Sequence, residues 1–152
     1  MLSRPTLALA ALLLALALAA CGGDDAPAPP KAGSGAQPLE GELRYERSGG
    51  FSGRMDEVVI APDGSATLAS SGGEAKPFRL TPAELDSLRS AAAAADLASV
   101  PADAGTGATP DDFGHRIDYR GRTVRTDDSS LPEALAPLVG ELGELVERHA
   151  EP

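Results

Sequence analysis

Apolar and polar residues alternate in five segments of the chain beyond residue 41, which is the pattern of strands that bury one face. These segments cover residues 42–48, 54–61, 65–70, 112–120 and 122–126. Two further segments carry apolar residues at helical spacing, one around Leu85 and Leu88 and one around Leu138 and Leu142. The order β-β-β-α-β-β-α predicts an α+β fold. We expect a five-stranded, mostly antiparallel sheet with both helices packed on one face.

Turn and cap residues mark the limits of these elements. Ala61-Pro62-Asp63-Gly64 places Pro and Gly where a type I turn favours them, so the second and third strands should form a hairpin. Arg120-Gly121 predicts a second tight turn between the last two strands. Thr81, Pro82 and Glu84 form a capping-box pattern, which indicates that the first helix begins there.

The last helix has a similar start signal. Ser130 and Glu133 repeat the capping-box spacing ahead of its apolar residues. Pro137 follows soon afterwards, and we expect it to kink the first turn or to delay the helix.

A separate apolar run lies at the N-terminus. Arg4 supplies a positive charge, and residues 6–20 are almost wholly Leu and Ala. The run is short for a membrane span, which needs about 20 apolar residues, and it has the layout of a secretion signal. It ends Leu18-Ala19-Ala20-Cys21, and this end resembles the lipobox of bacterial lipoproteins. The resemblance implies that residues 1–20 are removed and that Cys21 carries a diacylglyceryl group.

Cys21 is the single cysteine of the chain, which excludes an intramolecular disulfide and a Cys-based zinc site. The alternative is an ordinary cleaved signal with an unrelated cysteine nearby, but lipidation accounts for a lone thiol at this position. Two acyl chains, such as palmitate, hold a protein firmly where one chain does not. We therefore expect a lipoprotein anchored to the cell membrane and facing its extracytoplasmic side.

Residues 21–40 have the composition of a flexible linker. The stretch from Gly22 to Glu40 is mainly Gly, Ala, Asp and Pro with one Leu, so it lacks the apolar surface that offsets the entropy of ordering. A coil of this length reaches roughly 25 Å. Residues 41–152 then form one domain.

Charge and motifs narrow the classes of function. The formal net charge is −10, and removal of Arg4 with the signal makes it more negative. Such a domain should not bind nucleic acid or an anionic membrane surface through charge. Nucleophile elbows, zinc-protease helices, phosphate loops and dinucleotide fingerprints are missing from the sequence. We therefore expect a monomeric protein without catalytic residues, cofactor or metal.

Several motifs along the domain resemble the emfourin family. The most specific is Tyr45-Glu46-Arg47-Ser48-Gly49-Gly50-Phe51-Ser52-Gly53 in the first strand and the turn after it. Other similar features follow in order: the Asp63-Gly64 turn, Leu80 to Leu85, the acidic loop ending in Phe113, Asp118 to Gly121, and Leu131-Pro132. The resemblance covers nearly all of Gly41 to His149. Emfourin is a small inhibitor of thermolysin-like zinc metalloproteases of the protealysin type, so the resemblance implies a protease inhibitor.

The loop Gly49, Gly50, Phe51, Ser52, Gly53 is the first candidate for partner binding. Its three glycines permit positive φ and close approach to another protein. Phe51 would then enter an apolar pocket, which the resemblance identifies with the specificity subsite of a thermolysin-like protease. The alternative is a bulge or tight turn whose Phe51 folds back into the core. We favour this alternative, because a glycine-rich break in a strand usually serves geometry.

Four aspartates form a second candidate site. The turn at Arg120-Gly121 sets residue 113 near 128 and residue 114 near 127, which gathers the four carboxylates at one end of the hairpin. They are Asp111, Asp112, Asp127 and Asp128. Such a cluster can bind Ca²⁺ or approach a protease zinc. We favour a solvated cluster near the positive end of the last helix, because the spacing matches no known calcium loop.

The two histidines are weak candidates for a metal site. We place His115 on the outward face of its strand and His149 near a helix C-terminus, where it suits the helix dipole. A protein zinc site needs three or four ligands, and neither histidine has a second ligand at a characteristic spacing.

Two functions remain. The first is a membrane-tethered inhibitor that fills the active-site cleft of a thermolysin-like metalloprotease with a rigid loop. The second is a non-inhibitory lipoprotein that binds a ligand or a protein at the cell envelope.

Overall fold

A computed structural model of the chain describes residues 38–105 and 111–150. The predicted signal, Cys21 and most of the predicted linker lie outside these residues. The elements are β1 Leu43–Gly49, β2 Arg54–Ile60, β3 Ser65–Ser70, β4 Lys76–Arg79, α1 Pro82–Ala94, β5 Phe113–Tyr119, β6 Arg122–Asp127, the 3₁₀ turn η1 Asp128–Ser130, and α2 Ala136–Ala150.

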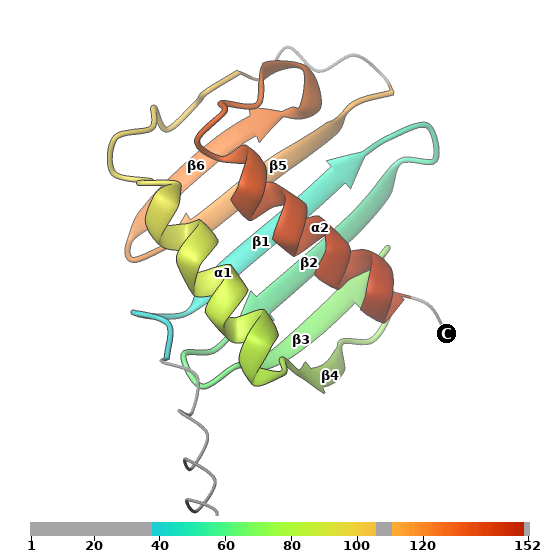
Figure 1. The fold of residues 1–152 in the computed structure, drawn as a ribbon. Helices are drawn as coiled ribbons and strands as arrows, with labels where there is room; N and C mark the ends of the chain where they lie inside the picture. The colour runs from blue at the N-terminus through green and yellow to red at the C-terminus, as the bar shows by residue number, and fades with distance from the viewer. Residues whose placement is uncertain (1–37, 106–110, 151–152) are drawn as a thin grey trace, which may run out of the picture. The chain divides into compact units, whose positions relative to one another are not determined.

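The strands form one sheet in the order β4-β3-β2-β1-β5-β6, and all neighbours are antiparallel. Strand β1 lies between β2 and β5, so that Tyr45 stands opposite Val58 on one side and Ile117 on the other. Both helices lie across the same face of the sheet (Figure 1). The predicted α+β class, the antiparallel sheet and the two covering helices are therefore confirmed.

The predicted number of five strands is wrong, because a sixth strand, β4, pairs with β3 at the edge of the sheet. This strand has four residues, Lys76–Arg79, and contains Pro77. Proline has no N–H to donate to a ladder, so it is tolerated in an edge strand, which has a neighbour on one side alone. A short segment interrupted by proline carries too little alternation to be recognised as a strand.

The predicted turns and the first helix start are confirmed. Gly64 closes the β2–β3 turn at φ +81°, and Arg120 and Gly121 join β5 to β6 with φ values of +52° and +73°. At the start of α1 the Thr81 hydroxyl accepts from the N–H of Glu84 at 3.3 Å. The Glu84 carboxylate in turn accepts from the N–H of Thr81 at 2.7 Å.

The capping box predicted at Ser130 and Glu133 is not formed, and α2 begins later, at Ala136. Leu131 precedes a proline, which disfavours helical dihedrals at that residue, and its φ and ψ are −62° and +115°. Asp127 caps η1 instead, accepting from the N–H of Ser130 at 2.8 Å. Pro137 lies in the first turn of α2, where its missing N–H needs no partner.

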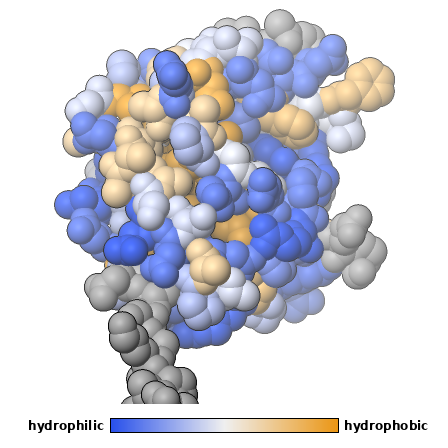
Figure 2. Space-filling model, viewed as in Figure 1, coloured by the Kyte–Doolittle hydropathy of each residue, from blue (hydrophilic) through white to orange (hydrophobic). Residues whose placement is uncertain are grey.

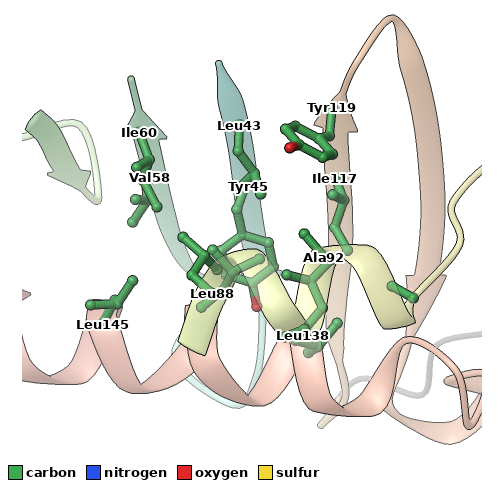
Figure 3. Close-up of a cluster of buried hydrophobic side chains, with 14 of the residues drawn as sticks. Leu43, Tyr45, Val58, Ile60, Leu88, Ala92, Ile117, Tyr119, Leu138 and Leu145 are labelled. Carbon is green, nitrogen blue, oxygen red and sulfur yellow. The ribbon is translucent and has the colours of Figure 1, made fainter. Parts of the chain in front are cut away.

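The core lies between the sheet and the two helices. Tyr45, Val58 and Ile117 on the sheet face Leu88 of α1 and Leu138 of α2 (Figure 3). At the N-terminal end, Leu39 of the predicted linker is buried in the same core, and its N–H donates to the carbonyl of Pro62 at 3.0 Å. Neither helix of the described residues has the length and apolar character that crossing a bilayer requires.

Candidate functional site

The turn between β1 and β2, residues Gly50–Gly53, presents Phe51 to solvent. The Phe51 side chain is 97% exposed, and that of Met55 at the start of β2 is 61% exposed. The favoured expectation that Phe51 folds back into the core is wrong. Neither helix passes over this turn (Figure 1), so the described residues provide no second layer there to receive an aromatic ring. We call residues 50–53 the tip.

The base of the tip is packed against the start of β5. The N–H of Gly50 donates to the carbonyl of Asp112 at 3.0 Å. A Cβ on Gly50, which has φ +66°, would lie 2.7 Å from the ring of Phe113, and a Cβ on Gly49 would lie 2.6 Å from the Asp112 oxygen. These glycines therefore serve the close approach of two backbones, and the tip combines a fixed base with a free aromatic side chain.

A row of buried polar side chains crosses the sheet below the tip. Arg47 of β1 stands opposite Asp56 of β2 on one side and His115 of β5 on the other. Ser70 and Thr126 extend the row to β3 and β6. All face the helices, whereas the next row inward is apolar, with Val58, Tyr45, Ile117 and Val124. We call Asp56, Arg47, His115 and Thr126 the polar row.

His115 lies on the inward face of β5, so the expectation that it points outward is wrong. Its position alternates in step with Ile117 and Tyr119, which are buried. One ring nitrogen, Nδ1, is 2.9 Å from the Tyr45 hydroxyl, and the other, Nε2, is 2.8 Å from Oδ1 of Asp128. Because a carboxylate accepts, Nε2 carries a proton and donates it to Asp128, while Nδ1 shares a hydrogen bond with the Tyr45 hydroxyl.

The burial of these groups is reflected in their pKa values. Burial raises the pKa of Tyr45 well above its usual range, although the nearby Arg47 lowers it. Burial also raises the pKa of Asp128, but hydrogen bonds from His115 and from the N–H of Phe113 outweigh it and the pKa is lowered. Tyr45 is therefore a neutral phenol and Asp128 an ionised acceptor at neutral pH.

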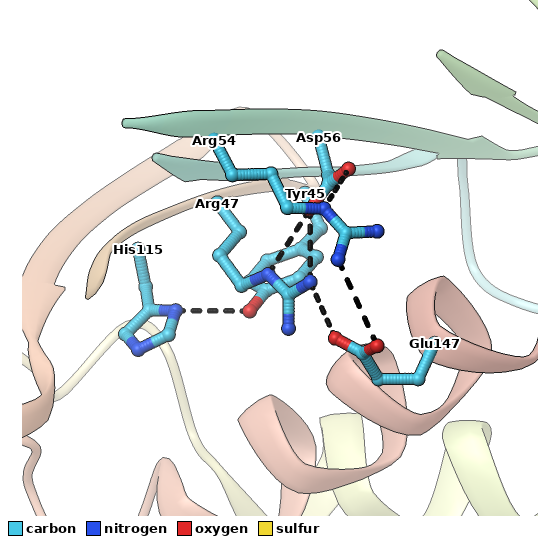
Figure 4. Close-up of polar contacts among 6 residues, drawn as sticks. All are labelled: Tyr45, Arg47, Arg54, Asp56, His115 and Glu147. Carbon is cyan, nitrogen blue, oxygen red and sulfur yellow. Dashed lines mark hydrogen bonds and ion pairs between the residues drawn. The ribbon is translucent and has the colours of Figure 1, made fainter. Parts of the chain in front are cut away.

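Arg47 and Asp56 form a buried ion pair that α2 completes (Figure 4). Nη2 of Arg47 donates to Asp56 at 2.8 Å and to Glu147 of α2 at 2.7 Å, and Arg54 lies 3.0 Å from Asp56. Burial lowers the pKa of Arg47, but its hydrogen bonds to Asp56 and Glu147 outweigh it and raise the pKa. Burial raises the pKa of Asp56, but Ser70 and the two guanidinium groups outweigh it, so that the pKa is lowered.

A groove of about 670 Å³ lies between the polar row and α2. Tyr45, Arg47, Phe113, His115 and Asp128 line one side, and α2 lines the other. Gly140 and Gly143 of α2 also border the groove, and a Cβ on either would have no described atom within 4 Å apart from the adjoining backbone of α2. On the face that carries the helices, the surface is mainly hydrophilic, and its apolar residues gather chiefly at the upper left of the view (Figure 2).

The predicted acidic cluster does not form a cation site in the described residues. The predicted register is confirmed, since Gly114 stands opposite Asp127, but the carboxylates have separate roles. Asp127 caps η1, Asp128 bonds His115 and the N–H of Phe113, and Asp111 is exposed. Across residues 38–105 and 111–150, no three His, Cys, Asp or Glu side chains are arranged to hold a metal ion.

His149 lies near the C-terminus of α2, as predicted, and stacks on Phe78 of β4 with ring centroids 4.0 Å apart. Burial and the neighbouring Arg148 lower the pKa of His149. Its ring therefore packs an edge strand against the helix as a neutral group at neutral pH.

The polar row was missed by the sequence analysis, although a signal for it exists. Each of the three central strands alternates apolar inward residues and then has a polar residue at the next inward position. These residues are Arg47 after Tyr45, Asp56 before Val58, and His115 before Ile117. The contact of Arg47 with Glu147, 100 residues away, has no local signal.

Comparison with protein families and with curated proteins gives no match to this chain. The function is therefore argued from the tip, the polar row and the groove.

Proposed function

We propose that this chain is a lipid-anchored extracytoplasmic protein that binds another protein through the tip. The observation that carries the proposal is the 97% exposure of Phe51 on a turn whose base is packed. An exposed aromatic side chain on a braced turn buries a large apolar area on binding and loses little conformational entropy. A free phenylalanine has no stabilising role within the domain itself.

The partner that we propose is a thermolysin-like zinc metalloprotease. The support for this class is the resemblance of Tyr45 to Gly53 to the emfourin family, because proteases of this kind offer an apolar subsite beside the zinc. Phe51 would fill that subsite, and the tip would occlude the cleft. The braced base disfavours the deformation that cleavage of the turn would need.

The second candidate is a non-inhibitory binding protein of the cell envelope, and the groove is the observation that favours it. A groove of about 670 Å³ is in the size range of small-ligand sites. Occlusion by the tip alone gives this groove no role.

The test is a titration of a thermolysin-like protease with the full chain, expressed with its own signal and purified in mild detergent. We expect stoichiometric loss of peptide hydrolysis. Phe51→Ala should weaken inhibition by at least about tenfold, since a central aromatic anchor contributes about 2 kcal/mol or more to binding. Met55→Ala is the matched control, because it removes an exposed apolar side chain on β2 outside the tip.

An equal loss in both variants would show non-specific apolar adhesion in place of tip insertion. Undiminished hydrolysis at large molar excess of the folded chain, against several such proteases, would contradict inhibition and leave the envelope-binding function.

Anchoring has its own test. When cells that express the wild-type chain are grown with labelled palmitate, the chain should carry the label and sediment with membranes. The Cys21→Ser variant should lose both properties. A wild-type chain without label would contradict the lipid anchor.

A further inference from the structure

The polar row is an unusual use of the inner face of a small sheet. Asp56, Arg47, His115 and Thr126 are all buried and stand side by side on four adjacent strands. Buried ion pairs of this kind are often no more stabilising than apolar residues of the same size, because desolvation offsets the attraction. Stability alone therefore does not account for a polar row next to an apolar one.

A continuous path of contacts leads from this row to the tip. His115 donates from Nε2 to Oδ1 of Asp128 at 2.8 Å, and Oδ2 of Asp128 accepts from the N–H of Phe113 at 3.0 Å. The residue before Phe113, Asp112, accepts from the N–H of Gly50 at 3.0 Å. Each of these hydrogen bonds holds the ring or backbone of a residue that lies next along the path.

Packing follows the same path. The guanidinium of Arg47 lies over the Phe113 ring, 4.8 Å from its centroid, and that ring packs against Gly50. The Tyr45 and His115 rings are stacked, with an interplanar angle of 11°. The Phe113 ring thus lies between the polar row and the tip and contacts both.

We propose that His115 and Asp128 are positioning residues for Phe51: they fix the start of β5, which fixes the base of the tip and so its binding geometry. This inference rests on the proposed docking of the tip. The two groups act through Phe113 and Gly50 and need no contact with the partner. Tyr45 completes the unit, because its hydroxyl holds the imidazole from the other side.

The chain offers a matched set of variants. Asp128→Ala removes the acceptor for both His115 and the N–H of Phe113. Asp128→Asn keeps every bond, because the amide oxygen accepts from Phe113 and the amide nitrogen donates to Nε2, while the imidazole proton moves to Nδ1 and is donated to Tyr45. Asp111→Ala removes an exposed carboxylate from the same end of β5 and serves as the control.

Two measurements are made on the full chain in detergent. Amide hydrogen exchange at Gly50 reports the bond to Asp112, with the Ile117 amide as an internal reference for global stability. Inhibition of a thermolysin-like protease reports docking. For Asp128→Ala we expect Gly50 exchange to rise and inhibition to weaken, each by at least about tenfold, since the N–H of Phe113 and Nε2 of His115 lose their acceptor.

Rescue separates positioning from simple stability. Asp128→Asn and Asp111→Ala should both match wild type at Gly50 and in inhibition. Unchanged Gly50 exchange in folded Asp128→Ala, or a loss in Asp128→Asn as large as in Asp128→Ala, would overturn the proposal. If the wild-type chain inhibits no protease, the proposed target fails, but the Gly50 measurement still decides whether these residues position the tip.

Discussion

The two turns at opposite ends of β2 differ in how much of each is in contact with the rest of the domain. At one end, the Ala61–Gly64 turn is packed: Leu39 donates to the carbonyl of Pro62, and Leu80 donates to that of Gly64 at 2.9 Å. At the other end, the tip leaves Phe51 free in solvent. The first turn is held by these backbone bonds and buries Gly64, although Pro62 and Asp63 are exposed, and the second carries an exposed aromatic residue.

The difference continues into the sheet. Ile60, next to the packed turn, belongs to the apolar core, whereas Asp56, near the tip, belongs to the polar row. One end of the domain is therefore built for stability, with the chain entering through buried Leu39. The other end carries the exposed Phe51, and the residues that support it are polar.

The largest expected effect is the loss of stability when the buried carboxylate of Asp56 is removed from the polar row. Asp56→Ala leaves the buried guanidinium of Arg47 with Glu147 as its one ion-pair partner among residues 38–105 and 111–150. The change should lower the free energy of unfolding by about 3–5 kcal/mol. Asp63→Ala in the packed turn should have a much smaller effect, because Asp63 and its partners Ser65 and Arg79 lie at the exposed surface. Urea unfolding of both variants checks the contrast, and equal destabilisation would contradict it.

The glycines of the tip give the next largest difference. Gly50→Ala and Gly53→Ala both place a side chain at positive φ, which costs about 1 kcal/mol. At Gly50 the new methyl also meets the Phe113 ring, whereas at Gly53 the space is open, so Gly50→Ala should cost roughly 1 kcal/mol more. Chemical denaturation of the pair measures this, and identical values would mean that the base of the tip is not packed.

Gly143→Ala should act in the opposite direction. Glycine in a helix is about 1 kcal/mol less favourable than alanine, and a methyl group at this position of α2 meets no described atom within 4 Å apart from the adjoining backbone of α2. The variant should be more stable by roughly that amount in urea unfolding. A destabilised variant would show that the groove is filled in solution.

The smallest effect is the pH dependence of the packed turn. Hydrogen bonds from the Ser65 hydroxyl and N–H lower the pKa of Asp63 from 3.8 to about 2. A lowered pKa stabilises the folded chain above 3.8, and this stabilisation is lost as the pH falls toward 2. Asp63→Asn should therefore lose less stability than wild type between pH 4 and pH 2. If the melting temperatures of the two proteins fall equally between pH 4 and pH 2, the lowered pKa is refuted.

The packed end was easier to predict from the sequence than the tip end. The Pro62–Gly64 turn and the Thr81 capping box are local signals, and both are confirmed. The edge strand β4 was missed because Pro77 interrupts a segment of four residues. The capping-box spacing at Ser130 and Glu133 does not start α2, because Pro132 disfavours helical dihedrals at Leu131.

At the tip end, one feature follows from a local pattern and the others depend on contacts between distant elements. The inward position of His115 follows from alternation with Ile117, so it was predictable from the pattern of β5. Its bond to Asp128 and the bond of Arg47 to Glu147 depend on how distant elements meet. The exposure of Phe51 depends on where the helix layer ends, which requires the three-dimensional arrangement.

The central claim is that the tip, and not the packed turn, docks on a protease cleft. The most direct test places the photo-crosslinking residue benzoylphenylalanine at position 51 or, separately, at position 63. Irradiation with a thermolysin-like protease should give a cross-linked product from position 51, and a small inhibitor that occupies the protease zinc should prevent it. A product from position 63, or one from position 51 that the zinc-site inhibitor does not reduce, would contradict the account.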